Sequence, residues 1–215
     1  MMFNILKNKI YNPLLLSLAG NVVMVFARML YAENLYYGFL LWNLFLAGMP
    51  LLISYYLYKH KEINRVVLYG SLFVWLLFLP NAPYIITDLV HLYHRPPVPF
   101  WYDMLLVLLS VYNGLVLGFV SVFQVEKIIL RRNAERFMLP FRIIVVLLMG
   151  YGVYVGRYLR FNSWDAIFNP VDLLRSIKNS LHLGTVGFVL TFGFVLFILY
   201  GFFRAIVLRH AQEAL

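Results

Sequence analysis

The chain has 215 residues, of which 63% are hydrophobic and only 13% are charged, with a mean hydropathy of +0.80 and a net charge of +9. A soluble domain usually carries about 25% charged residues, so this composition excludes an ordinary soluble domain and indicates an integral membrane protein. The absence of cysteine excludes disulfides, thiolate catalysis and cysteine-ligated zinc. The basic residues flank apolar runs, where they set topology and meet lipid headgroups, so we expect no nucleic-acid partner.

Six apolar runs each approach the roughly 20 residues that a helix needs to cross the hydrocarbon core. They are Pro13–Tyr31, Leu35–Tyr58, Val66–Pro83, Phe100–Val125, Leu139–Leu159 and Leu183–Leu208. These runs lack the polar stripes, repeated every 3.6 residues, that a helix in a soluble core would carry. We therefore predict an all-α, polytopic transmembrane bundle that forms a single domain over residues 1–215, with membrane lipids around it.

The first apolar run has the basic flank of a secretory signal peptide, supplied by Lys7 and Lys9. However, the run is long, and Arg28–Ala32 is a poor cleavage site because it lacks the small residues that signal peptidase requires. We therefore expect a retained helix.

The distribution of Lys and Arg predicts the orientation of the six spans. If the N-terminus is cytoplasmic, twelve of the 18 basic residues fall on the cytoplasmic side and six on the other. This excess satisfies the positive-inside rule, so we predict that both termini are cytoplasmic. The two longest connections, about Tyr84–Pro99 and Arg160–His182, then face outward.

The first outer connection is unusually rich in charge for so apolar a chain. If Tyr84–His94 forms a short α-helix, Tyr84, Asp88, His91 and Arg95 fall on a single stripe at i, i+4, i+7 and i+11. Asp88 and His91, three residues apart, are close enough for the carboxylate to orient the imidazole. The alternative is that the stripe is only a solvated face, with the nearby aromatic residues forming an ordinary interfacial belt.

The second outer segment begins inside the fifth span, in the sequence GYGVYVGRYLRFNSWD. Gly152 and Gly156 permit close approach to another helix, and Arg157 follows them immediately. A charge at the membrane boundary generally faces the bundle interior with a partner, and the candidate partners are Asp88, Asp103 and Asp165. Further along, Asn169–His182 has one apolar and one polar face, which predicts an amphipathic helix at the outer leaflet.

These side chains suggest three kinds of chemistry on the outer face. The proposed acid–base group is Asp88, His91 and Asp165, because a carboxylate beside an imidazole can exchange protons with a substrate. The proposed binding residues, suited to a phosphate or carboxylate, are Arg157, Arg160, Asn162, Tyr84 and Arg95. Asp88, His91 and His94 offer ligands for a metal ion, although their spacing matches no metal-binding signature.

Three motifs together carry a resemblance to a known family. WNLFLAGMP, WLLFLPNAPYIITDLVHL and GRYLRFNSWD, which begin at residues 42, 75 and 156, resemble an uncharacterised family of bacterial multi-pass membrane proteins, a domain of unknown function. The resemblance implies a helical bundle in the bacterial cytoplasmic membrane and brings no activity or cofactor. Three functions remain open: an enzyme acting on a lipid-linked or envelope substrate, a transporter or binding protein for a small anion or lipid, and a non-catalytic assembly partner.

Overall fold

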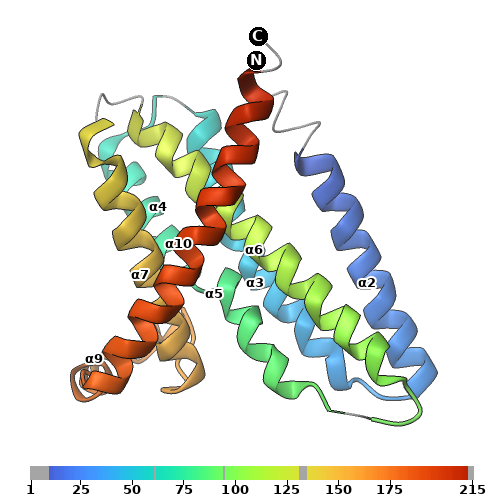
Figure 1. Cartoon of the computed structure of the whole chain (residues 1–215). Coiled ribbons are helices and arrows are strands. Elements are labelled where there is room, and N and C mark those ends of the chain that lie inside the picture. The colour runs from blue at the N-terminus through green and yellow to red at the C-terminus, as the bar shows by residue number, and fades with distance from the viewer. Residues whose placement is uncertain (1–9, 61, 94, 131–134, 213–215) are drawn as a thin grey trace.

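The computed structural model describes residues 10–60, 62–93, 95–130 and 135–212, and these form a helical bundle (Figure 1). Six of its helical segments are long and apolar enough to cross a membrane. The elements are α2 (Asn12–Ala32), η2 (Tyr36–Gly38), α3 (Phe39–Lys59), α4 (Arg65–Phe78), α5 (Asn81–Tyr84), η3 (Ile85–His91), α6 (Phe100–Leu130), η4 (Glu135–Phe137), α7 (Met138–Arg157), α8 (Asp165–Phe168), α9 (Pro170–Asn179) and α10 (Leu183–Gln212), where η marks a 3₁₀-helix. The predicted polytopic bundle is confirmed.

The six spans share one centre, which is helix α6. Its apolar window is 61% buried within the protein, whereas that of α10 is only 17% buried. Helix α3 packs along α6 and α10 packs along α7, and α10 crosses α6 in Figure 1. Helix α2 begins and α10 ends at one end of the bundle, whereas α9 lies at the other. The end with α9 is the predicted outer end, and the end where α2 begins is the predicted cytoplasmic end.

The third span continues beyond the point where the sequence predicts its end. We expected it to stop at Pro83, but the helical path runs from Arg65 to His91 through α4, α5 and η3. A proline lacks only its own N–H and disturbs the turn before it, so the chain can resume a helical path after it. Two backbone hydrogen bonds carry the path across the prolines, from Ala82 to Leu79 at 3.2 Å and from Tyr84 to Pro80 at 3.0 Å.

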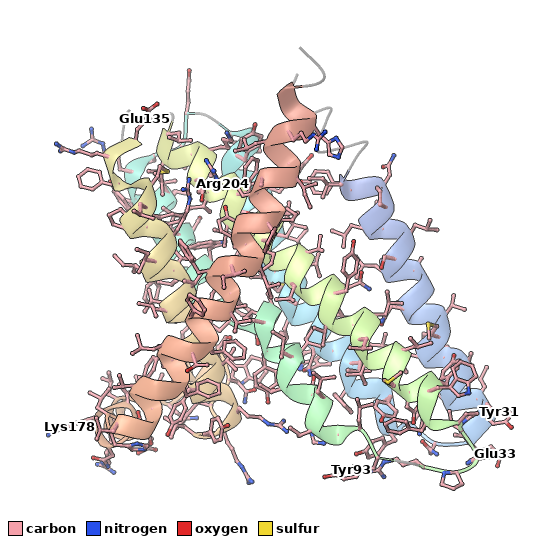
Figure 2. The ribbon with its side chains drawn as sticks, viewed as in Figure 1. Tyr31, Glu33, Tyr93, Glu135, Lys178 and Arg204 are labelled. Carbon is pink, nitrogen blue, oxygen red and sulfur yellow. The ribbon has the colours of Figure 1, made fainter. Side chains whose placement is uncertain are left out.

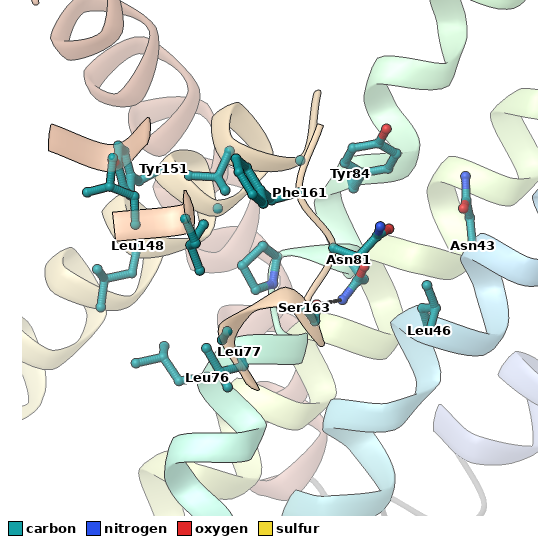
Figure 3. Close-up of a pocket in the computed structure, with 18 of the residues that line it drawn as sticks. Asn43, Leu46, Leu76, Leu77, Asn81, Tyr84, Leu148, Tyr151, Phe161 and Ser163 are labelled. Carbon is teal, nitrogen blue, oxygen red and sulfur yellow. Dashed lines mark hydrogen bonds between the residues drawn. The ribbon is translucent and has the colours of Figure 1, made fainter. Parts of the chain in front are cut away.

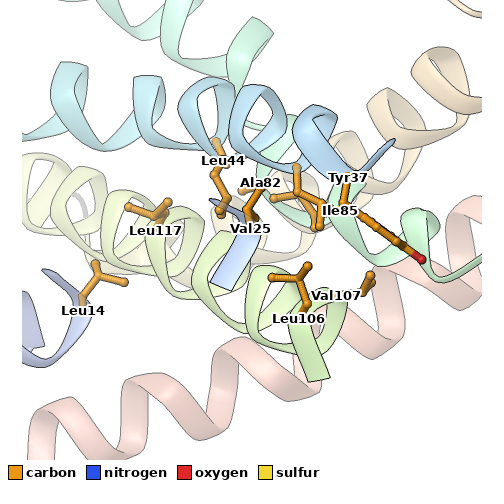
Figure 4. Close-up of a cluster of buried hydrophobic side chains, with 11 residues drawn as sticks. Leu14, Val25, Tyr37, Leu44, Ala82, Ile85, Leu106, Val107 and Leu117 are labelled. Atoms are coloured by element: carbon orange, nitrogen blue, oxygen red, sulfur yellow. The ribbon is translucent and has the colours of Figure 1, made fainter. Parts of the chain in front are cut away.

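Helix α5 lies against two glycines of α6. A Cβ atom added at Gly114 would lie 2.8 Å from the Ala82 carbonyl oxygen, and one added at Gly118 would lie 2.6 Å from the Ala82 Cβ. Ala82 and Ile85 are fully buried here, in a cluster that joins α2, α3 and α6 (Figure 4). The small residues therefore let the α5 backbone approach α6 more closely than any larger side chain would allow.

The opposite face of α5 lies against the two glycines that precede Arg157 on α7. A Cβ at Gly152 would lie 2.2 Å from the Pro80 ring, and a Cβ at Gly156 would lie 3.1 Å from the Tyr84 ring. The close approach predicted from Gly152 and Gly156 is therefore made to the proline-containing segment. Because α5 is held between α6 and α7, the residues that follow it in η3 have a defined position.

A buried ion pair joins α2 to α6 near the predicted outer end. Arg28 Nε lies 3.2 Å from Asp103 Oδ1, and Arg28 Nη2 lies 3.4 Å from Oδ2, with both side chains at most 1% exposed. Arg28 Nη1 donates to Asn34 Oδ1 at 2.5 Å, and the guanidinium lies 4.7 Å from the centre of the Tyr37 ring. The sequence made Asp103 a candidate partner of Arg157, but the structure pairs Asp103 with Arg28.

The second outer connection contains the amphipathic helix that the sequence predicts. The prediction of Asn169–His182 corresponds to α9, which begins with Pro170 in its first turn and ends at Asn179. Lys178 of this helix lies at the same end of the molecule as Tyr31, Glu33 and Tyr93, opposite Glu135 and Arg204 (Figure 2). Its position at a lipid leaflet stays a prediction, as does the orientation of the bundle.

Candidate functional site

Asp88, on η3, is the acidic centre of the predicted site. Its side chain is almost fully buried, and it faces one residue from α3 and one from the end of α7. Asn43 Nδ2 donates a hydrogen bond to Asp88 Oδ2 at 2.7 Å, and Arg157 Nη1 lies 4.0 Å from Asp88 Oδ1. The expected partnership of Asp88 with Arg157 is therefore present, as an ion pair that is longer than a direct hydrogen bond.

His91 completes this group, which we call the Asp88 cluster: Asn43, Asp88, His91 and Arg157. Arg157 Nη1 and Nη2 lie 3.3 and 3.4 Å from His91 Nε2. An arginine can only donate, so Nε2 must be the acceptor and the imidazole is neutral, with its proton on Nδ1. The edge of the imidazole packs against the Phe39 ring, with the ring centres 5.5 Å apart.

The 3₁₀ geometry of η3 explains which predicted residues meet. With three residues per turn, Asp88 and His91 lie directly above one another, so both reach Arg157. The α-helical stripe expected through Tyr84, Asp88, His91 and Arg95 is wrong, because η3 is not an α-helix and ends at His91. Tyr84 instead packs against Gly156.

Arg95 binds an aromatic residue of η2 and forms no ion pair with Asp88 among the described residues. Its guanidinium is 3.6 Å from the centre of the Tyr36 ring, and Nη2 donates to the Tyr36 hydroxyl at 2.7 Å. Its Nε is buried and has no hydrogen-bond partner among the described residues. Arg95 therefore ties the first outer connection to the start of α3, and no contact joins it to Asp88.

Of the predicted residues in the second outer segment, Arg157 belongs to the Asp88 cluster, whereas Asp165 and Arg160 make other contacts or none. Asp165 Oδ2 accepts the backbone N–H of Asn162 at 2.6 Å, and Oδ1 accepts from Asn169 Nδ2 at 3.2 Å. These bonds hold the turn that leads into α8, and none links Asp165 to Asp88, His91 or Arg157. Arg160 is exposed, has a positive φ of 62°, and forms no ion pair with a described residue.

A pocket of about 330 Å³ lies beside the Asp88 cluster, between α3, the α4–α5 turn, α7 and the second outer segment (Figure 3). Its polar lining includes Asn43, Asn81, Asn162 and Ser163, together with the aromatic residues Trp42, Tyr84, Tyr151 and Phe161. Its apolar lining is Leu46, Leu76, Leu77, Pro80, Leu148, Gly152, Val155, Gly156, Ala166, Leu173 and Ile177. Among the residues that the structure describes, no charged side chain lines it.

Asn43 connects the pocket to the Asp88 cluster. It lines the pocket and donates its amide N–H to Asp88, which leaves the amide oxygen to accept a hydrogen bond. On the opposite wall, Asn81 Nδ2 donates to Ser163 Oγ at 2.9 Å and so fixes the second outer segment over the α4–α5 turn (Figure 3). The pocket therefore presents neutral hydrogen-bonding groups above an apolar floor.

The metal site suggested by Asp88, His91 and His94 is not assembled by the described residues. No three His, Asp or Glu side chains among them lie close enough together to hold a metal ion. His94 lies outside the described residues, so its part in that prediction is untested. His91 Nε2 instead lies 3.3 Å from Arg157 Nη1, and a guanidinium cannot act as a metal ligand because it has no lone pair to donate.

Comparison with known families identifies most of the chain. Residues 42–199 match the family described as Protein of unknown function (DUF1361). The chain belongs to the DUF1361 family. Neither the curated proteins nor the solved structures contain a match to it. This agrees with the uncharacterised family that the three sequence motifs indicate.

The matched segment of this DUF1361 protein contains the complete pocket lining and the whole Asp88 cluster, whereas α2 with Arg28 lies outside it. Asn43 is the site residue that the sequence-based site predictions do not include. The sequence does contain a signal for this residue, because Asn43 is the one amide in the otherwise apolar motif WNLFLAGMP. Only the fold shows that its partner is a buried carboxylate.

Proposed function

We propose that this DUF1361 protein binds a lipid or lipid-linked molecule of the cell envelope in the pocket at the predicted outer end. The observation that carries the proposal is the lining of the pocket, which combines side-chain amides and a hydroxyl with aromatic and aliphatic side chains. Such a lining suits an amphipathic ligand, whose head accepts and donates hydrogen bonds and whose hydrocarbon part needs an apolar wall. We also propose that the protein resides in the bacterial cytoplasmic membrane.

The position of the pocket supports entry from the lipid side. Trp42 lines the pocket and is 54% exposed on α3, and its ring lies 6.4 Å from that of Trp164 in the second outer segment. Tryptophan prefers the level of the lipid headgroups, so this pair supports a position of the pocket beside that layer. A membrane lipid could then reach the pocket sideways without crossing water.

The lining favours a neutral polar head over a small anion. No arginine or lysine of the described part of the chain lines the pocket, and the Arg157 guanidinium already contacts His91 and Asp88. In this proposal Asp88 acts through Asn43, because the hydrogen bond between them aims the Asn43 amide oxygen at the ligand. An enzymatic step on the bound head extends the proposal, with Asp88 and His91 as its acid–base pair.

A pocket-filling variant tests the binding proposal. Ala166 lines the pocket on α8, and Ala166→Phe adds a ring that occupies part of the 330 Å³. We expect the amount of lipid that copurifies with the protein in mild detergent, measured by mass spectrometry, to fall at least about tenfold, since losing 1.4 kcal/mol of binding suffices for that change. The matched control is Ala205→Phe on the exposed surface of α10, which should retain the lipid.

The same measurement separates binding from catalysis. If wild-type and Ala166→Phe proteins carry the same lipids in the same amounts, the pocket is not the binding site and the proposal fails. A time-dependent change in the mass of the bound lipid with wild-type protein, absent with Asp88→Asn, would establish the enzymatic extension. Membrane abundance and the melting temperature of Asp88→Asn must match the wild type for that result to count.

A further inference from the structure

A second group of charged side chains lies at the predicted cytoplasmic end, where α6, α7 and α10 meet. Its centre is the buried carboxylate of Glu126 on α6. Arg142 of α7 binds it through Nε at 2.7 Å and Nη2 at 3.2 Å. Arg204 Nε and the Tyr200 hydroxyl, both from α10, donate to it at 3.3 and 2.9 Å. This Glu126 cluster therefore ties three spans together.

The Glu126 cluster carries more positive charge than its single carboxylate can balance. Two guanidinium groups share that carboxylate, and Lys127 follows it in sequence within electrostatic range of both arginines. Arg204 binds Glu126 through Nε alone. Its Nη1 and Nη2 form no hydrogen bond with a described residue, and neither does Arg142 Nη1. The two arginine side chains are 32% and 19% exposed, so these N–H groups are accessible.

The depth of the cluster matches the headgroup layer of a bilayer. Glu126 lies four residues before α6 ends at Leu130, and Arg142 lies four residues after α7 begins at Met138. At 1.5 Å per residue, the cluster is about 6 Å inside the ends of these helices. Figure 2 shows Arg204 near Glu135, at the opposite end of the molecule from Lys178. The phosphates of the adjoining leaflet lie near this level.

We propose that Arg204 and Arg142, with Lys127, bind the phosphate of an anionic phospholipid at the end of the bundle where α2 begins. The free Arg204 Nη1–H and Nη2–H form a fork that can grip two phosphate oxygens, which is the geometry arginine offers to phosphates. An anionic lipid is favoured over a zwitterionic one because the cluster has surplus positive charge, which repels a choline group. Helix α10 is the least buried span, so a lipid reaches Arg204 directly from the leaflet.

The experiment compares lipids on purified full-length protein. We measure retention of phosphatidylglycerol and phosphatidylcholine from mixed detergent micelles by native mass spectrometry, for wild type, Arg204→Gln, Arg204→Lys and Arg136→Gln. Arg136 is the matched control, since it is an exposed arginine near the same end that lies 4.6 Å from the centre of the Phe137 ring and forms no ion pair with a described residue. Glu126 keeps Arg142 and Tyr200 in Arg204→Gln, so that variant should fold, and its melting temperature checks this.

We expect wild type and Arg136→Gln to retain phosphatidylglycerol in preference to phosphatidylcholine. Arg204→Gln should bind phosphatidylglycerol about tenfold or more weakly, because a charge-assisted hydrogen bond is lost, and Arg204→Lys should fall between them. Equal retention of both lipids by wild type, or unchanged retention by a folded Arg204→Gln, overturns the proposal. If millimolar inorganic phosphate displaces the lipid and itself raises the melting temperature in an Arg204-dependent way, the site is a phosphate site whose ligand is soluble, and the lipid assignment fails.

Discussion

Replacing Asp103 by leucine lowers the free energy of unfolding by about 3–5 kcal/mol, because it leaves the Arg28 guanidinium buried without its counter-ion. Asp103 supplies both of its oxygens to Arg28, and the side chain of Arg28 is only 1% exposed. The remaining hydrogen bond to Asn34 and the contact with the Tyr37 ring cannot compensate for a lost negative charge. Reversible unfolding of the purified protein in detergent, followed by circular dichroism, measures the change.

The double variant Arg28→Met with Asp103→Leu decides whether the loss comes from the unpaired charge. Replacing a buried ion pair by apolar residues of similar size is often neutral, so the double variant should be more stable than either single variant. Additive losses would contradict this account. Glu33→Gln is the control, because Glu33 is exposed at the end of α2 and should change the stability by less than about 0.5 kcal/mol.

Gly152→Ala is expected to destabilise the protein by about 1–3 kcal/mol, although alanine normally stabilises a helix. The new methyl group would lie 2.2 Å from the rigid Pro80 ring, so α5 and α7 must move apart. Because Gly152 and Pro80 both line the pocket, the same variant should also reduce the amount of copurified lipid. The measurements are the detergent unfolding assay and the lipid retention assay.

Gly20→Ala is the matched comparison for Gly152→Ala. Gly20 lies within α2, and a Cβ added there would meet nothing within 4 Å. The substitution should therefore leave stability unchanged or raise it by up to about 1 kcal/mol through helix propensity. If both variants shift the stability in the same direction and by the same amount, the close contact between α5 and α7 does not control the packing of this region.

The Asp88 and Glu126 clusters use buried charge in different ways. At the predicted outer end, one carboxylate faces one guanidinium at 4.0 Å, and an asparagine links the carboxylate to a pocket. At the other end, one carboxylate binds two arginines, and the surplus positive charge remains partly exposed. We propose a ligand for each: an amphipathic molecule with a neutral head at the first, and a lipid phosphate at the second.

The sequence by itself determined the class of the protein and the position of its spans. A run of about 20 apolar residues has few options other than a membrane-crossing helix, because every backbone polar group must be satisfied within the segment. The alternation of apolar and polar residues predicted the amphipathic helix α9. The three motifs indicated an uncharacterised family, and the family match over residues 42–199 confirms it. Gly152 and Gly156 predicted close packing, which is a local property of small side chains.

Only the tertiary structure decided which charges meet. Arg157 had three candidate partners, Asp88, Asp103 and Asp165, and the choice of Asp88 follows from η3 being a 3₁₀-helix held between α6 and α7. That geometry also takes Arg95 off the predicted stripe, and Asp103, a candidate partner of Arg157, pairs with Arg28 of α2 instead. Sequence spacing constrains contacts within one helix, but contacts between helices depend on crossing angles and rotations that no single helix encodes.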